Sequence, residues 1–364
     1  MADMNDTKLK YQIIKEYIIG LIESGELSPD EQIPSEPELS KIFNISIISV
    51  RRALFELVNE MRIYRIKGKG SFVAHSAAEK KDNRRFSDNI LGFVLSAKQD
   101  IYDSSLMKMT RGIQSCLIDN GYSLVIEYCD GSLEKEKEII NRLIDDGIKG
   151  IVYYSADPDK NIALLKKMNE KKVAFVLVDR YAKNFPAYYV VSDNFGSAFY
   201  AMEYLLGMGH RKIAFVTYSG ICISTETGRY EGYIRAMGNA NLPVDKHMVM
   251  DYISLDQDSF VSMINNGDIT AVFAINDFVA IEIMKICEKH GIGIPESLSI
   301  MGFDDIDQAA WQKTPLTSIK QYFDKMGCEA AKTLVKAIRN PDKAIRKIEL
   351  STKLTTRKSV LQIN

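Results

Sequence analysis

From residue 90 onward, short apolar runs alternate with amphipathic stretches of helical length, and this alternation restricts the fold more than any other feature of the chain. The apolar runs span residues 90–95, 123–127, 150–154, 173–178, 212–217, 248–253, 271–275 and 299–303. Strands separated by helix-length segments predict βαβ units and parallel sheets. The alternation restarts after Asp193, so we expect an α/β domain with two sheets.

The N-terminal segment, residues 11–73, has a different pattern. Apolar residues recur at spacings of three and four from Tyr11 until Gly25 ends the run, which predicts a first helix. A second helix is expected to begin just after Ser35, which is followed three residues later by Glu38 and so forms a capping box.

A tight turn and a hairpin complete this segment. Residues 44–46 are predicted to form the turn, and a third helix follows from about Ile47. Two short helices around such a turn make a helix-turn-helix. Residues 63–66 and 71–73 are expected to pair as strands around the glycine-containing loop 67–70, which adds a wing.

The charge distribution supports a contact with nucleic acid. The whole chain carries a formal net charge of −1, but a sum over the chain hides where the charges lie. The first forty residues hold three Lys against nine Asp or Glu, whereas residues 41–75 hold seven Lys or Arg against two Glu. A local basic region of this kind can neutralise phosphates.

Several classes of protein are disfavoured by the sequence. No apolar run approaches the roughly 20 residues of a membrane span, and the first ten residues are polar, so we expect no signal peptide and a cytoplasmic protein. Five scattered cysteines without a Cys-x-x-Cys pair argue against disulfides and zinc. The four histidines lack the spacing of a helical zinc site. We expect no metal and no cofactor.

Enzymatic motifs are also missing from the sequence. The chain has no complete dinucleotide or phosphate-binding glycine loop and no nucleophile with a nearby base. His210 could suggest a general base, but it precedes a predicted strand and is interpreted as structural. We therefore expect no catalytic residue and no enzyme.

Four motifs occur in the N-terminal segment in the order typical of one family of regulators. They are GELSP (25–29), IPSEPEL (33–39), SIISVRRAL (46–54) and KGKGSFV (67–73). With these motifs the segment resembles the DNA-binding domain of the gluconate-repressor (GntR) family. The resemblance implies a winged helix that binds a two-fold operator, with the third helix in the major groove.

The resemblance and the exposed helix face together give a predicted DNA-binding set. It comprises Ser35, Glu36, Ser46, Ile47, Ser49, Arg51, Arg52, Lys67, Gly68 and Lys69. The family usually has Arg where this chain has Ile47, so a bidentate reader of guanine is missing there. Ile47 and Ile48 could contact thymine methyl groups or serve as half-buried props, and base rates for apolar residues favour props.

From Leu91 to about Ser359 the chain carries a second group of motifs. They are VDR (178–180), SDNFG (192–196), GHRKIAFV (209–216), RYEGY (229–233), AIND (274–277), IMGFDD (300–305) and PLTSI (315–319). With them this part resembles the effector domain of the lactose/galactose-repressor (LacI/GalR) family, which is similar to periplasmic sugar-binding proteins. A GntR-type head on a LacI-type body resembles the arabinose repressors of Gram-positive bacteria.

This second resemblance implies a ligand site. The matching positions are Asp179, Arg229, Asn276 and Asp304 for sugar hydroxyls and Phe323 for an aromatic contact. These residue types suit a sugar, whose hydroxyls donate and accept hydrogen bonds and whose C–H face packs on an aromatic ring. Each residue also has a structural alternative, since an Asp at a strand end can cap a helix and an Arg can form a surface ion pair. Loop 96–105 is about three residues longer than is usual in the family.

These observations divide the chain into a winged helix-turn-helix of α+β type at 1–75, a linker at 76–89, and a two-lobe periplasmic-binding-protein-like domain with parallel sheets at 90–364. We expect a homodimeric, sequence-specific repressor that a small sugar, arabinose-like or related, releases from a pseudo-palindromic operator in double-stranded DNA. Use of the ligand as a corepressor, an activator mode, and a solute-binding protein are the alternatives.

Overall fold

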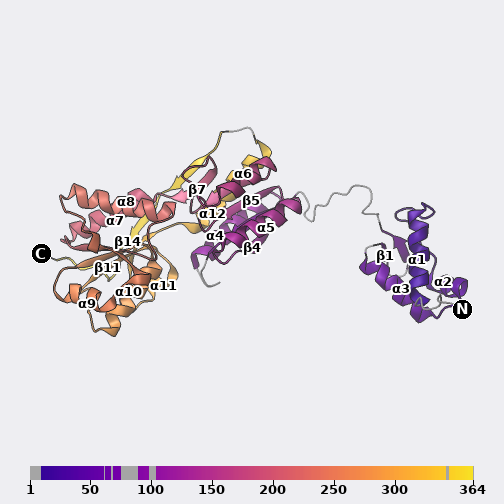
Figure 1. The fold of residues 1–364 in the computed structure, drawn as a ribbon, viewed down its shortest axis with the longest axis horizontal. Coiled ribbons are helices and arrows are strands. Elements are labelled where there is room, and N and C mark those ends of the chain that lie inside the picture. The colour runs from indigo at the N-terminus through magenta and orange to yellow at the C-terminus, as the bar shows by residue number, and fades with distance from the viewer. Residues whose placement is uncertain are drawn as a thin grey trace, which may run out of the picture. The chain divides into compact units, whose positions relative to one another are not determined.

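The computed structural model describes residues 10–60, 62–66, 69–74, 89–97, 104–341 and 344–363. The chain forms two compact units, Met1–Asp82 and Asn83–Asn364. The predicted linker, residues 76–89, lies outside the described residues except for its last one. Each unit is therefore described by itself (Figure 1).

The N-terminal unit is a winged helix-turn-helix, as predicted. Its elements are α1 (Lys10–Glu23), α2 (Glu36–Phe43), α3 (Ile47–Asn59), β1 (Ile63–Ile66) and β2 (Gly70–Val73). The two strands are antiparallel, with Ile63 opposite Val73. Apolar side chains on the inward faces of all three helices, among them Ile14, Leu39 and Leu54, are buried together with both strand residues and form one core. A single small core of this kind is consistent with a domain of this size.

The turn of the helix-turn-helix follows from local chemistry. The Glu38 carboxylate accepts the backbone N–H of Ser35 at 2.8 Å and thereby satisfies a donor at the start of α2. Asn44 ends α2 in the left-handed region at φ 50°, where Asn is one of the few residues tolerated. The Oγ of Ser46 accepts the backbone N–H of Ser49 at 3.3 Å and caps α3. The sequence thus fixes where both helices begin.

The C-terminal unit contains two six-stranded sheets, and we name the two halves lobe 1 and lobe 2. In lobe 1 the strand order is β13-β7-β6-β5-β3-β4, and every neighbouring pair is parallel. Lobe 1 consists of β3 (Ile90–Leu95), α4 (Ser104–Ile118), β4 (Ser123–Tyr128), α5 (Leu133–Asp145), β5 (Gly150–Tyr154), α6 (Ile162–Glu170), β6 (Ala174–Val178), β7 (Tyr188–Ser192), α12 (Phe323–Arg339) and β13 (Lys347–Leu350).

Lobe 2 repeats this architecture with the order β14-β12-β11-β10-β8-β9. Its pairs are parallel except for the antiparallel edge strand β14. Lobe 2 consists of α7 (Asn194–Gly207), β8 (Ile213–Thr217), α8 (Ser224–Asn239), η1 (Lys246–Met248), β9 (Val249–Asp251), η2 (Tyr252–Ser254), α9 (Gln257–Asn265), β10 (Ala271–Ala274), α10 (Asp277–Lys289), β11 (Ser299–Asp304), α11 (Asp307–Ala310), β12 (Thr317–Lys320) and β14 (Lys353–Thr355).

The chain passes between the lobes three times, from β7 to α7, from β12 to α12 and from β13 to β14. In lobe 1, α4 and α12 pack on one face of the sheet and α5 and α6 on the other, whereas lobe 2 has one continuous core. The eight predicted strands are all present, although the run 248–253 was predicted too long because residues 252–254 form a 3-10 helix. Strands β7, β12, β13 and β14 were not predicted.

Helices α4 and α12 lie side by side in lobe 1 (Figure 1). A Cβ on Gly112 would lie 2.0 Å from the backbone oxygen of Asp324, and a Cβ on Gly327 would lie 2.2 Å from that of Met109. Any side chain at either glycine would therefore overlap the backbone of the other helix. The two helices meet backbone to backbone.

A disulfide joins the same two helices. Cys116 on α4 and Cys328 on α12 are bonded, with a Cα–Cα distance of 5.4 Å. The prediction that the cysteines form no disulfide was therefore wrong. The two residues are 212 positions apart in the sequence, so only the packing of α4 on α12 brings them together, and cysteine spacing gives no sign of it.

Candidate functional site

The predicted DNA-binding residues lie at the starts of α2 and α3 and on the wing. Lys67 and Gly68 lie outside the described residues, while Lys69 is exposed. Ser35 and Ser46 are engaged in capping, as described above. A helix start presents unpaired N–H groups that suit a phosphate.

Glu36 connects α2, α3 and the wing. Its carboxylate accepts hydrogen bonds from Nε of Arg51 at 2.7 Å and from Nη2 of Arg65 at 2.6 Å. The hydrogen bond from Arg51 lowers the pKa of Glu36 most, and Arg65 adds to it against the effect of partial burial. Glu36 is thus an ionised group that aligns two exposed guanidinium groups. Arg65 was not predicted, although it lies in the basic region of the sequence.

The remaining predicted residues of α3 differ in their surroundings. Arg52 lies 4.3 Å from the ring centre of Tyr11 and 3.6 Å from the carboxylate of Glu56. Ile47 is 42% exposed and Ile48 is 79% exposed. The interpretation of both isoleucines as half-buried props is therefore wrong for Ile48, because its side chain points into solvent and supports no core.

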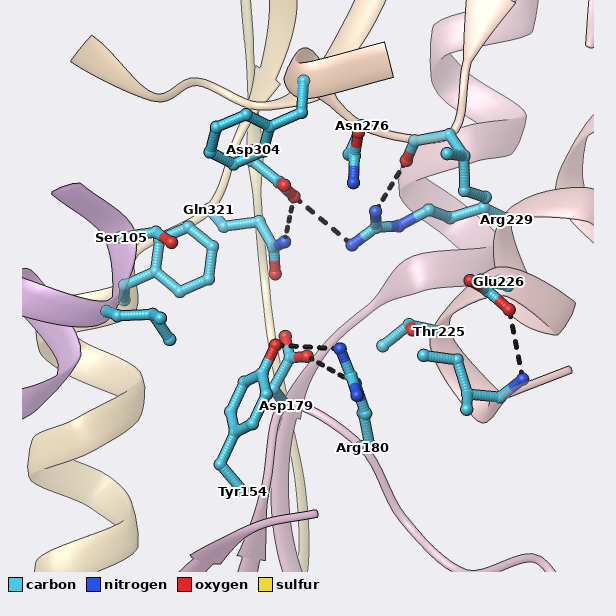
Figure 2. Close-up of a pocket in the computed structure, with 15 residues that line it drawn as sticks. Ser105, Tyr154, Asp179, Arg180, Thr225, Glu226, Arg229, Asn276, Asp304 and Gln321 are labelled. Carbon is cyan, nitrogen blue, oxygen red and sulfur yellow. Dashed lines mark hydrogen bonds and ion pairs between the residues drawn. The ribbon is translucent and has the colours of Figure 1, made fainter. Parts of the chain in front are cut away.

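A polar pocket lies between the two lobes, where the carboxyl ends of the parallel strands meet (Figure 2). Ligands bind at this edge in open α/β sheets. All five predicted ligand residues line the pocket, and their role in binding stays a prediction. The lining residues are Ser105, Leu106, Tyr154, Asp179, Arg180, Ile223, Thr225, Glu226, Arg229, Ile275, Asn276, Phe278, Asp304, Gln321 and Phe323.

Lobe 2 contributes a buried arginine held by three different elements. Nε of Arg229 donates to the side chain of Asn194 at 2.9 Å, Nη1 to the carbonyl of Ile275 at 2.7 Å, and Nη2 to Asp304 at 3.4 Å. The guanidinium carbon lies 3.8 Å from the ring centre of Phe303. These contacts fix the guanidinium in one orientation, as a planar group with five donors allows.

Lobe 1 contributes a second arginine in a similar setting. Nη1 of Arg180 donates to the carbonyls of Ser155 and Ala156 at 3.1 and 2.9 Å, and Nη2 donates to the Tyr154 hydroxyl at 3.0 Å. Its guanidinium carbon lies 4.7 Å from the ring centre of Tyr154. Nε is 3.5 Å from the carboxylate of Asp179, yet within the described part of the chain it has no hydrogen-bond partner. Nε of Arg180 is therefore a buried donor that faces the Asp179 carboxylate without forming a hydrogen bond among the described residues.

The charge of Arg180 is supported by its surroundings. Burial opposes this charge, but Tyr154 and the carboxylates of Asp179, Glu226 and Glu136 outweigh burial and raise its pKa. The pocket as a whole has two cationic side chains, Arg180 and Arg229, against the three carboxylates of Asp179, Asp304 and Glu226. An anionic ligand would thus meet an excess of like charge, whereas a neutral polar ligand would not.

Both pocket aspartates have unusual backbone conformations. Asp179 adopts φ 67° and Asp304 φ 114°. Non-glycine residues in this region cost free energy and are concentrated at functional sites. Each aspartate follows or ends a central strand, so the positive φ turns its side chain into the pocket rather than along the sheet.

Asn276 and Phe323 both have a structural role in addition to lining the pocket. The side-chain oxygen of Asn276 accepts the backbone N–H of Val279 at 3.0 Å and caps α10. A ligand contact from Asn276 would therefore come from its Nδ2–H₂ group. Phe323 is 7% exposed and packs in the lobe 1 core while also lining the pocket, so only a small part of its ring is available there.

Sequence reasoning missed several lining residues. Arg180 belonged to a quoted motif but was not selected, and Tyr154 and Gln321 were not considered. The signal for Tyr154 was its position at the end of a predicted strand, beside that of Asp179. Gln321 lies on a crossing between the lobes, which no strand pattern marked. Its Nε2 donates to Asp304 at 2.6 Å, and its Oε1 is buried with no hydrogen-bond partner among the described residues.

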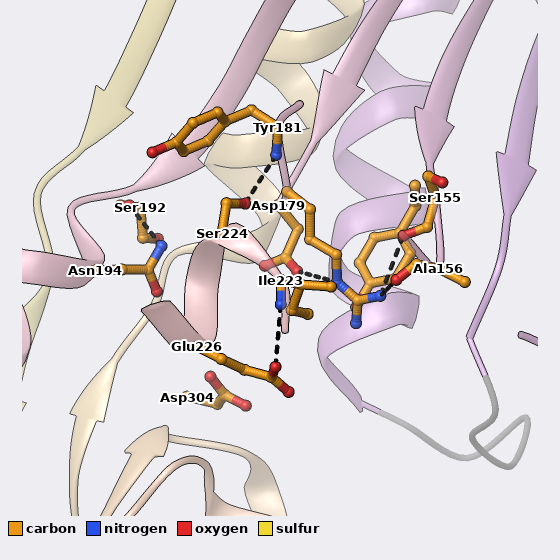
Figure 3. Close-up of polar contacts among 12 residues, drawn as sticks. Ser155, Ala156, Asp179, Tyr181, Ser192, Asn194, Ile223, Ser224, Glu226 and Asp304 are labelled. Atoms are coloured by element: carbon orange, nitrogen blue, oxygen red, sulfur yellow. Dashed lines mark hydrogen bonds and ion pairs between the residues drawn. The ribbon is translucent and has the colours of Figure 1, made fainter. Parts of the chain in front are cut away.

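Direct contacts between the lobes flank the pocket. The backbone N–H of Tyr181 donates to the Ser224 hydroxyl at 3.0 Å (Figure 3). On another side, Nζ of Lys108 lies 2.6 Å from the carboxylate of Asp307. Both contacts join residues of lobe 1 to residues of lobe 2, so the lobes are closed around the pocket in this conformation.

His210 is a structural residue in this fold. It is 1% exposed, with Nδ1 3.1 Å from the Thr270 hydroxyl and Nε2 3.1 Å from the carbonyl of Leu361. Burial lowers its pKa. It thereby attaches the C-terminal segment to lobe 2, and it does not line the pocket.

Other kinds of site find no support within the described ranges. No group of three or more His, Cys, Asp or Glu side chains could hold a metal ion there. No described helix combines the length and the apolar character needed to cross a bilayer.

Comparison with known families separates the two units. Residues 10–73 match the family of bacterial regulatory proteins described as gntR family, and residues 202–360 match the periplasmic binding protein-like domain. The N-terminal unit thus matches the gntR family, and most of lobe 2 with the end of the chain matches the periplasmic binding protein-like domain. This combination was predicted from the motifs and is confirmed.

Curated relatives match across both domains. The arabinose metabolism transcriptional repressor of Geobacillus stearothermophilus is 28% identical over 340 residues, which cover 90% of this chain and 91% of the relative. The protein of the same description from Halalkalibacterium halodurans is 24% identical over 339 residues, covering 90% and 89%. The chain therefore resembles these repressors through the gntR-family domain as well as the periplasmic binding protein-like domain.

Solved structures agree on the fold. The transcriptional regulator CelR–cellobiose complex aligns with a TM-score of 0.66 at 23% identity and covers 88% of this chain and 94% of its own. A LacI family transcriptional regulator from Enterococcus faecium with bound ribose has a TM-score of 0.63 at 24% identity, with coverages of 76% and 100%. At these identities the likeness establishes the two-lobe fold.

Proposed function

We propose that the protein is a transcriptional repressor that binds a pseudo-palindromic operator as a homodimer and is released by a small neutral sugar of the arabinose-like pentose class. The pocket observation that carries the proposal is the pair of unsatisfied atoms described above. Nε of Arg180 is a donor without a hydrogen-bond partner, and Oε1 of Gln321 is an acceptor without one, within the described residues. A polyol supplies both acceptors and donors, so its hydroxyls suit both atoms.

The balance of charge supports a neutral ligand over a phosphosugar. Each pocket arginine has an aspartate within 3.5 Å, so neither guanidinium is left to neutralise a phosphate. The relatives named as arabinose repressors support a pentose. The aromatic ring of Phe323 at the pocket supports a ligand with a C–H face.

The proposed switch works through closure of the two lobes. Ligand that bridges Arg180 in lobe 1 and Arg229 in lobe 2 stabilises the closed form, and the three interlobe crossings act as the hinge. Closure in each subunit would change the separation of the two DNA-binding domains and reduce their simultaneous binding to both half-sites. A hundredfold preference of the sugar for the released form corresponds to about 2.7 kcal/mol of coupling.

The homodimer is proposed to involve two exposed apolar side chains on lobe 1. Met107 and Ile118 are 57% and 61% exposed, and because they lie eleven residues apart on α4 they share one face of that helix. Exposed large apolar side chains that share a face are typical of interaction surfaces. Sedimentation velocity should show a dimer, and Met107→Glu with Ile118→Glu should shift it towards monomer. Because operator DNA is its target, we propose that the protein acts in the cytoplasm.

The decisive experiment uses operator DNA selected from a random library by the protein itself. Fluorescence anisotropy of the preformed complex is followed during titration with L-arabinose, D-ribose and D-glucose 6-phosphate. Release by a pentose but not by the phosphosugar supports the proposal. Tighter DNA binding with sugar would establish the corepressor mode, and no response to any sugar would overturn the assignment of the ligand. Arg51→Ala should weaken operator binding and leave sugar affinity unchanged.

A further inference from the structure

A fully buried carboxylate lies behind the lobe 1 wall of the pocket. Glu136, on α5, is 0% exposed. Its carboxylate accepts hydrogen bonds from the hydroxyls of Tyr153 and Ser155, from the backbone N–H of Ala156 at 2.7 Å, and from the side-chain amide of Asn161. An ionised carboxylate is an acceptor only, so four donors directed at it are the arrangement expected for the charged form.

The segment held by Glu136 also holds Arg180. Ser155 and Ala156 direct a hydroxyl and an N–H towards Glu136, and their carbonyl oxygens accept the two hydrogen bonds from Nη1 of Arg180. The same two residues thus connect the buried carboxylate of Glu136 to the guanidinium of Arg180. Glu136 itself does not line the pocket.

Electrostatics couples the two groups in the same direction. Arg180 has lost much of its hydration, because its side chain is only 19% exposed. A negative charge on Glu136 one residue layer behind it favours the guanidinium at this place. Carbonyl oxygens in fixed positions determine which way the planar group faces, and hence where its unpaired Nε–H points.

We propose that Glu136 is a positioning residue of the ligand pocket, which sets the orientation of Arg180 through Ser155 and Ala156. The proposal rests on the function proposed above only in taking the ligand of Arg180 to be a sugar. A residue that merely stabilised lobe 1 would join α5 to the end of β5 and act on ligand affinity without regard to Arg180.

A double-mutant cycle separates the two roles. Isothermal titration with L-arabinose on the full chain compares wild type, Glu136→Gln, Arg180→Ala and the double variant. Glu136→Gln keeps the shape of the side chain and should weaken binding about tenfold, as expected for disturbance of a buried polar network. In the Arg180→Ala background the same change should cause no further loss. An equal loss in both backgrounds, or unchanged affinity in Glu136→Gln, would overturn the proposal.

A matched control and a milder variant complete the set. Glu138→Gln removes an exposed carboxylate from the same helix and should leave sugar affinity unchanged. Ser155→Ala deletes the hydroxyl that donates to Glu136 and leaves the charge unchanged. This variant replaces Glu136→Gln in the test if Glu136→Gln does not fold. It should weaken binding about two- to threefold, the size expected for one lost hydrogen bond in a network, and only where Arg180 is present.

Hydrogen exchange followed by mass spectrometry supplies a readout that needs no sugar. In Glu136→Gln, amide exchange should become faster both in residues 150–157 and in residues 179–183, where Tyr181 donates to Ser224. Faster exchange in the first segment alone would mean that Arg180 does not depend on Glu136, and would overturn the proposal. If the wild type binds none of the sugars, the ligand assignment fails, whereas the exchange result still decides the role of Glu136.

Discussion

The two walls of the pocket are built from the same parts in different ways. Each lobe presents an arginine over an aromatic ring, Arg180 over Tyr154 and Arg229 over Phe303, with an aspartate within 3.5 Å. In lobe 2 the Nε, Nη1 and Nη2 atoms of Arg229 donate to three separate segments of the chain. In lobe 1 the partners of Arg180 come from one short segment at the end of β5, and its Nε has none among the described residues. The lobe 2 wall is thus already organised, while the lobe 1 wall retains a donor that the proposed ligand would satisfy.

The largest effect is expected from removing the arginine of the organised wall. Arg229→Ala takes a buried charge away from Asp304, and breaking a buried pair costs about 3–5 kcal/mol. Sugar affinity should fall at least hundredfold, about 2.7 kcal/mol, with operator affinity in the absence of sugar near wild type. Calorimetry and anisotropy measure the two. Arg235→Ala, an exposed arginine on the same helix, is the control, and loss of operator binding without sugar would show that Arg229 supports the fold instead.

The second effect tests the covalent link that lobe 1 has and that lobe 2 lacks within the described residues. Cys116→Ser should lower the free energy of unfolding by about 2–4 kcal/mol, as is typical of disulfides that close long loops. The thermal midpoint of the wild type should fall when a thiol reductant is added, and that of the variant should not. The exposed Cys222 provides a control, since Cys222→Ser should keep the response to reductant. A wild type that ignores reductant would contradict the disulfide.

A smaller effect is expected from the less organised wall. Arg180→Ala removes a guanidinium held largely by backbone carbonyls, and sugar affinity should fall about tenfold, near 1.4 kcal/mol. The comparison of the walls predicts that this loss is smaller than the loss in Arg229→Ala. Titration calorimetry on both variants decides the order, and a larger loss for Arg180→Ala would reverse the interpretation of which wall is organised in advance.

The smallest effect concerns acid. Burial lowers the pKa of His210, so in mildly acidic solution the unfolded chain binds a proton that the folded chain excludes. The free energy of unfolding should therefore decrease as the pH falls through the ordinary histidine range, near 6.5. Lobe 1 has no histidine between residues 89 and 192. Urea unfolding measures the decrease in the free energy of unfolding between pH 7.5 and pH 5.5. This decrease should be about 1 kcal/mol smaller in His210→Gln than in the wild type. The control His290→Gln changes an exposed histidine and should behave like the wild type.

The sequence predicted the central strands because they are buried on both faces and therefore form continuous apolar runs. It did not reveal β13 and β14, which are edge strands with alternating polar residues, or β7 and β12, which lie next to the crossings between the lobes. The five ligand candidates came from the motifs that resemble the LacI/GalR family. Three of them, Asp179, Asn276 and Asp304, also lie at or just after strand ends, which collect at one edge of a sheet. Gln321 was not predicted, since its place depends on where the chain crosses between the lobes. The disulfide and the contacts of Glu136 depend on how helices pack in the folded protein. The residue pattern of a single sequence does not show that packing.

The close approach of α4 and α12 has a consequence for how this chain can vary. Every amino-acid replacement at Gly112 or Gly327 adds a Cβ, and a Cβ at either position would overlap the backbone of the other helix. Neither glycine can therefore be replaced by a single substitution, because the other helix would first have to move away. The two helices also begin at the pocket, with Ser105 and Phe323 in its lining. Substitutions that change ligand specificity are thus easier to accommodate in the loops and in α8 than at the contact between α4 and α12.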